Sequence, residues 1–93
     1  MIEIEDILTR TCELYGVTEG EVKSHRGGRE VQLSRLVFVN IAKKYGWRHR
    51  EIAEAINRSV GDISYCLSSK QKDSILYVRG YNSMLSKIAH DTE

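Results

Sequence analysis

The sequence predicts an all-α fold, a small helical domain of five to six helices. The 93-residue chain contains no proline, and its seven glycines are too few to punctuate a series of strands and hairpins. Apolar residues recur at helical spacing through most of its length. The composition, 41% hydrophobic and 29% charged, is typical of a folded globule rather than of a disordered chain. Because a chain of this length holds one core, we expect residues 1–93 to form a single domain.

The first predicted helix spans residues 3–15. Three acidic residues in its first turn suit the positive end of a helix dipole, and Gly16 is expected to end the helix as a left-handed cap. One face of this helix is apolar and should face the core: Ile4, Ile7, Leu8, Cys12 and Tyr15.

A capping box formed by Thr18 and Glu21 predicts a short second helix that runs to about Ser24. A basic loop with two adjacent glycines follows at residues 25–29. Two interpretations of this loop stay open. Its arginines, Arg26 and Arg29, either reach a nucleic-acid backbone or minor groove, or they are ordinary exposed side chains.

Residues 31–45 are apolar on most sides and predict a central helix that is buried nearly all round. The run is rich in β-branched residues, but fifteen residues without a breaker are too many for a strand. Arg35 is the exception within it. The guanidinium either forms an internal salt bridge or snorkels to the surface, or it reaches a phosphate.

Residues 51–67 predict two short helices joined by a tight turn. Asn57 stands where the chain needs a left-handed residue, and Ser59 with Asp62 supplies a capping box for the second helix. Ala53 is small where two steeply crossing helices would touch. This combination is typical of a helix-turn-helix, whose second helix enters the DNA major groove.

The formal net charge is +1, but the charges are unevenly distributed. Residues 1–22 carry one arginine against six acidic residues, a net charge of −5, whereas residues 23–58 carry nine basic residues against three acidic ones, a net charge of +6. Residues 59–93 carry four charges of each sign. A basic middle segment contiguous with a helix-turn-helix is typical of phosphate binding, with a solvated charge pattern of no function as the alternative.

The candidate DNA-binding residues fall into two groups. The basic residues are expected to lie near phosphates: Arg26, Arg29, Arg35, Arg48, His49, Arg50, Arg58 and Lys70. The second helix of the motif offers short polar groups and one aromatic ring to the groove: Ser59, Gly61, Asp62, Ser64, Tyr65 and Ser68. Its first turn contains no Arg or Gln for bidentate base contacts, so strong direct readout is not expected. Arg58 also occupies a turn position that is usually apolar.

Residues 73–89 predict a last amphipathic helix, in which Gly80 costs about 1 kcal/mol relative to alanine. Two roles stay open for this helix. It either covers the core or is an appended element that binds a second copy of the chain or a larger parent protein.

From Ile4 to about Lys70 the chain resembles the C-terminal DNA-binding domain (domain IV) of the bacterial replication initiator DnaA, a Trp-repressor-like helical fold. The resemblance follows the order of the helices and the segment that ends Ile41-Ala42-Lys43-Lys44-Tyr45. It implies that the basic loop enters the minor groove and that Arg35 lies near the DNA backbone. The chain departs from the family at Asn57–Ile63, where the turn is one residue shorter and the base-reading His and Thr have no counterparts.

The resemblance and the charge pattern together predict double-stranded DNA binding, with replication initiation and transcription regulation both open as roles. The alternative is a protein–protein interaction module that keeps the fold without DNA. No nucleophile triad, carboxylate pair, metal-ligand cluster or phosphate-binding loop occurs at useful spacing, so we expect no enzyme activity, metal or cofactor. Cys12 and Cys66 lie among apolar residues, and no run is long enough to span a membrane. We therefore expect a cytoplasmic protein with reduced thiols.

Overall fold

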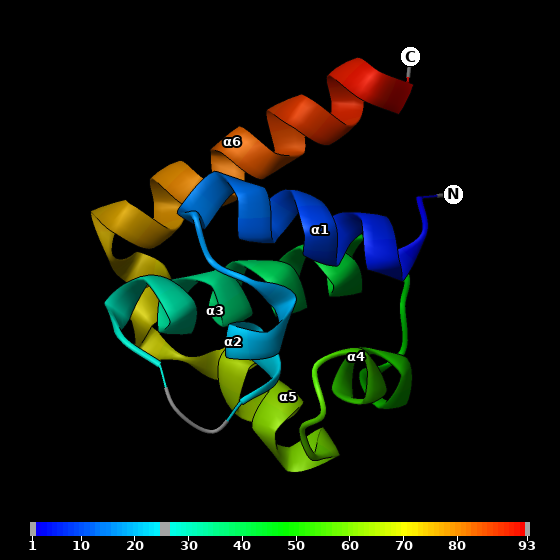
Figure 1. Cartoon of the computed structure of the whole chain (residues 1–93), viewed down its shortest axis with the longest axis vertical. Helices are drawn as coiled ribbons and strands as arrows, with labels where there is room; N and C mark the ends of the chain where they lie inside the picture. The colour runs from blue at the N-terminus through cyan, green and yellow to red at the C-terminus, as the bar shows by residue number, and fades with distance from the viewer. Residues whose placement is uncertain (1, 25–26, 93) are drawn as a thin grey trace.

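In the computed structural model, which describes residues 2–24 and 27–92, the chain is helical with no strand in these ranges (Figure 1). This confirms the predicted all-α class. The helices run in the order α1 (Ile4–Tyr15), α2 (Glu19–Lys23), α3 (Arg29–Lys44), α4 (His49–Ala55), α5 (Val60–Ser68), the short 3-10 turn η1 (Lys70–Asp73) and α6 (Ile75–Thr92).

Helix α3 is the centre of the fold, because it contacts each of the other five described α-helices. Nine of its sixteen residues are buried, and Val37, Phe38 and Ile41 are fully enclosed. Helices α1 and α6 lie on one side of α3, whereas α2, α4 and α5 lie on the other (Figure 1). The prediction of a central helix buried nearly all round is confirmed, although α3 begins two residues earlier than expected, at Arg29.

The first two helices follow their local signals. Gly16 ends α1 with a left-handed φ of 65°, which a glycine adopts without steric cost. In α2, the amide of Glu21 donates to Thr18 Oγ1 over 3.1 Å and the amide of Thr18 donates to Glu21 Oε1 over 3.0 Å. The predicted capping box is therefore present.

Helices α4 and α5 are joined by the predicted tight turn. Asn57 has a φ of 55°, which confirms the left-handed conformation expected there. Ser59 caps α5, since its Oγ accepts from the amide of Asp62 over 3.1 Å while the carboxylate of Asp62 accepts from the amide of Ser59 over 3.3 Å. Helix α4 begins at His49, two residues before the predicted start, because Glu51 Oε1 accepts a hydrogen bond from the amide of Arg48 and so caps the extra turn.

Helix α6 continues without a break through Gly80 and contacts α1 and α3. Its inner face buries Tyr77, Met84 and Ile88 in the core. Gly80 is itself buried, and a Cβ atom at this position would lie 1.8 Å from the Tyr15 hydroxyl. The glycine thus permits α6 to approach the end of α1 closely, which explains why it stands inside a helix that it would otherwise weaken.

The structure shows where the two thiols lie and whether any described helix could span a membrane. Cys12 is a buried free thiol, and Cys66 is a half-buried one. Among the helices of the described residues, none combines the length and the apolar character that a membrane span requires.

Candidate nucleic-acid interface

The outer face of α5 is open to solvent. Ile63 points into the core and is fully buried, whereas Val60 and Tyr65 expose 49% and 68% of their surface. Helix α5 packs against α3 and α4, and α6 lies on the far side of α3 (Figure 1). The short polar residues predicted to enter a groove are therefore exposed on one helix face: Gly61, Asp62, Ser64 and Ser68.

Some of these polar groups also have a role in the helix itself. Ser59 and Asp62 form the cap of α5, so the carboxylate of Asp62 is a capping group as well as an exposed acceptor. The hydroxyl of Ser68 donates to the carbonyl of Ser64 over 3.0 Å. Burial is the main cause of a raised pKa of the Cys66 thiol, and the charge of Asp62 raises it further. This side chain is therefore neutral at physiological pH.

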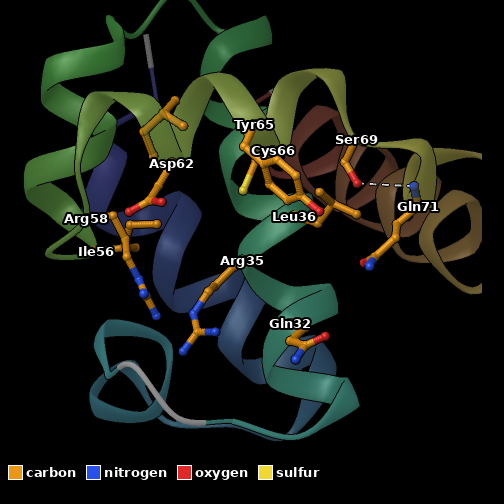
Figure 2. Close-up of a pocket in the computed structure, with 11 residues that line it drawn as sticks. Gln32, Arg35, Leu36, Ile56, Arg58, Asp62, Tyr65, Cys66, Ser69 and Gln71 are labelled. Atoms are coloured by element: carbon orange, nitrogen blue, oxygen red, sulfur yellow. Dashed lines mark hydrogen bonds between the residues drawn. The ribbon is translucent and has the colours of Figure 1, made fainter.

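A cleft of about 330 Å³ separates α5 from the N-terminal half of α3 (Figure 2). Sequence analysis did not identify three of its polar residues. Gln32 lies one helical turn before Arg35, and this spacing could have placed it on the same helix face as Arg35. Ser69 and Gln71 belong to the turn η1 and its cap, which the sequence did not predict. The full lining is Gln32, Arg35, Leu36, Ile56, Arg58, Asp62, Ile63, Tyr65, Cys66, Ser69 and Gln71.

Arg35 is half-buried and donates hydrogen bonds to the end of α2. Its Nε donates to the carbonyl of Val22 over 2.8 Å, and its Nη2 donates to the carbonyls of Ser24 and Glu21 over 2.5 and 3.1 Å. Burial is the main cause of a lowered pKa of the Arg35 guanidinium, and the nearby charge of Arg58 lowers it further. A guanidinium remains protonated even when it is partly buried, so Arg35 and Arg58 are two cations held close together.

Arg58 reaches the same place from the turn between α4 and α5. Its Nη2 donates to the carbonyl of Ser24, which also accepts from Arg35. Figure 2 shows both guanidinium groups pointing out of the cleft toward the end of α2. This contact accounts for the polar residue at a turn position that is usually apolar. Phosphate binding by Arg35 and Arg58 stays a prediction, and both side chains have internal carbonyl partners.

The other predicted cations are at the surface. Arg29 is the first residue of α3, and Arg48 and Arg50 flank the start of α4, all three exposed. His49 is half-buried beside them, and Lys70 is exposed in η1. Arg26 lies outside the described residues.

An acidic surface bounds this region on the side of α1. The N-terminus of α1 and the outer face of α4 line a second hollow of about 410 Å³, which contains Glu3, Glu5, Glu51 and Glu54. Trp47 lies in the same hollow and donates from Nε1 to the carbonyl of Ile2 over 3.2 Å. The ring therefore attaches the N-terminal segment to the core, and the acidic groups place a negative potential beside α4.

The described part of the chain is therefore a small all-helical domain. Its helices α4 and α5 are joined by a tight turn, the outer face of α5 is exposed, and exposed arginines lie at the start of α4. No known family model matches the chain. It is 28% identical over 69 residues to the chromosomal replication initiator protein DnaA of Pseudothermotoga lettingae. The match covers 73% of this chain but only 16% of that protein, so the similarity concerns a short part of the initiator.

Proposed function

We propose that this domain binds double-stranded DNA and that α4 and α5 act as a helix-turn-helix with α5 in the major groove. The observation that carries the proposal is the open polar face of α5, which begins at a capped N-terminus directly after a left-handed turn residue, Asn57. Exposed Tyr65 lies on this face, where it is able to contact a thymine methyl group or a phosphate.

Four exposed cations near the ends of α3, α4 and α5 would neutralise phosphates. Arg29 starts α3, Arg48 and Arg50 flank the start of α4, and Lys70 follows the end of α5. The first turn of α5 offers small side chains and a carboxylate rather than Arg or Gln. Recognition would therefore depend on phosphate contacts and DNA shape more than on direct base readout.

The similarity to a DnaA protein supports a role with DNA in replication initiation, and transcription regulation is the second role compatible with a domain of this size. The proposal assigns the domain a binding role alone, with no enzyme activity and no cofactor.

Selection from a randomised duplex pool, followed by sequencing of the retained fraction, tests the proposal. We expect a short motif to be enriched and retention to fall at least about tenfold for an Arg29→Gln, Arg50→Gln double variant. The control is Arg79→Gln, which removes one exposed charge from α6 on the far side of α3 and should leave retention unchanged. Absence of any retained duplex would contradict the proposal.

One observation favours a protein–protein interaction module as the second candidate. The first turns of α6 expose three apolar side chains, Ile75, Leu76 and Val78, which a protein partner would cover more readily than DNA. If the pool experiment retains no duplex while sedimentation shows self-association that an Ile75→Ser, Val78→Ser variant removes, this second candidate replaces the first.

A further inference from the structure

The end of α2 is held by two arginines from different parts of the chain. The carbonyl of Ser24 accepts from Arg35 on α3 and from Arg58 in the α4–α5 turn, and Arg35 also bonds the carbonyls of Glu21 and Val22. Helix α3, which carries Arg35, begins at the exposed Arg29. The end of α2, helix α3 and the α4–α5 turn therefore meet at one carbonyl.

We propose that Arg35 and Arg58 are positioning residues: they clamp the end of α2 against α3 and the α4–α5 turn, and thereby fix α3, with the exposed Arg29 at its start, relative to α5. They do not themselves contact phosphate. The part of this inference that concerns DNA rests on the proposed function, whereas the clamp itself does not.

Helix termini explain why a clamp is needed here. The last carbonyls of any helix lack intrahelical partners, and α2, with five residues, is too short to be stable alone. A charged donor at a helix C-terminus satisfies these carbonyls and interacts favourably with the helix dipole. The guanidinium of Arg35 bonds the carbonyls of Glu21 and Val22 in α2 and that of Ser24 directly after it, which its planar fork allows and a lysine ammonium on a flexible stem does not reproduce.

The hydrogen bonds of Arg35 also distinguish a positioning role from a phosphate contact. Nε and Nη2 of Arg35 both donate to main-chain carbonyls of α2 or of Ser24, the residue after it, and the side chain is half-buried. A phosphate contact contributes about 0.9 to the slope of log affinity against log salt concentration, but a group that acts only through the position of other residues contributes nothing to this slope.

The decisive variant is Arg35→Lys, which keeps the charge and removes the fork. Affinities for a duplex from the selected pool and for a shuffled duplex would be measured between roughly 50 and 200 mM salt. For the clamp we expect affinity for the selected duplex to fall about tenfold, with an unchanged salt slope and a smaller ratio of selected to shuffled affinity. A loss of folded protein alone would lower both affinities by the same factor and leave this ratio unchanged.

Arg35→Gln and Arg50→Gln complete the comparison. We expect Arg35→Gln to leave the salt slope unchanged, whereas the exposed control Arg50→Gln should reduce it by about 0.9. An Arg35→Lys protein that binds like the original, or an Arg35→Gln protein whose slope falls by about 0.9, would overturn the proposal. If Arg35→Lys does not fold, Arg58→Lys takes its place, because Arg58 also donates to Ser24.

Hydrogen exchange tests the clamp without DNA. The amides of Val22 and Ser24 donate to the carbonyls of Thr18 and Glu21 within the last turn of α2. We expect both amides to exchange at least about tenfold faster in Arg35→Lys, while amides in α6 keep their rates. Faster exchange with no duplex retained would support the clamp and reject only the DNA function. Unchanged exchange would overturn the clamp.

Discussion

Gly80→Ala should have two opposing effects on the free energy of unfolding, a gain in helix propensity and a steric clash with Tyr15. In an exposed helix this substitution would stabilise the protein by about 1 kcal/mol, because alanine has the higher helix propensity. Here the new Cβ would lie 1.8 Å from the Tyr15 hydroxyl oxygen and 2.8 Å from Cζ of the same ring. Overpacking of this kind typically costs 1–3 kcal/mol. Because the Tyr15 ring must shift within a packed core to relieve both contacts, we expect the larger part of that cost and a net loss of about 1–2 kcal/mol.

Chemical denaturation with a double-mutant cycle measures this balance. The Tyr15 hydroxyl is buried without a hydrogen-bond partner among the described residues, so Tyr15→Phe should keep or slightly raise the free energy of unfolding. Removing the hydroxyl also removes the closest overlap, and Gly80→Ala should therefore cost about 1 kcal/mol less in the Phe background.

The matched control is Gly20→Ala in α2, where the nearest atom to the added Cβ is 3.8 Å away. We expect this substitution to stabilise the protein by about 0.5–1 kcal/mol. If Gly80→Ala stabilised the protein by a similar amount, or if the cycle showed no coupling with Tyr15, the packing of α6 against the end of α1 would be refuted.

Three further predictions concern the turn, the cap and a thiol. Asn57→Ala should lower the free energy of unfolding by about 1 kcal/mol, whereas Asn57→Gly should be nearly neutral, because only alanine is strained at a φ of 55°. Equal losses for the two variants in a denaturant titration would argue against a left-handed residue in this turn. Ser59→Ala should cost about 1 kcal/mol through loss of the α5 cap, measured in the same way, and a neutral result would contradict the cap. Burial, followed by the charge of Glu19, raises the pKa of Cys12 from 9.0 to about 11. The folded state therefore favours the neutral thiol, and this contribution to stability is fully present below pH 9.0 and lost as the pH rises through about 11. Denaturation curves should accordingly show the original protein losing stability faster than Cys12→Ala over that range, and parallel losses would show that this thiol is not buried.

Local signals were sufficient to predict most of the fold. Gly16, Asn57 and the capping boxes act within four residues of their own position, so their geometry can be inferred from the sequence alone. The central helix was also predictable, because its apolar residues cover most of its circumference. The turn η1 was not predicted, since its residues are polar and carry no periodic pattern.

The candidate site was less predictable because its contacts join distant segments. Arg35 bonds a carbonyl thirteen residues away, and Arg58 bonds one thirty-four residues away. Composition and spacing identify such arginines as cations near a basic surface, but only the packing of α2 against α3 gives them internal partners. The closeness of Gly80 and Tyr15 likewise depends on how α6 crosses α1, which no local rule specifies.

If the exposed basic residues of the domain bind the phosphates of a duplex, duplex affinity must depend on salt concentration. The exposed cations Arg29, Arg48, Arg50 and Lys70 predict a slope of log affinity against log salt concentration of about −3 to −4, reduced by nearly 2 in an Arg29→Gln, Arg50→Gln variant. A slope near zero, or one that the double variant leaves unchanged, would contradict the account.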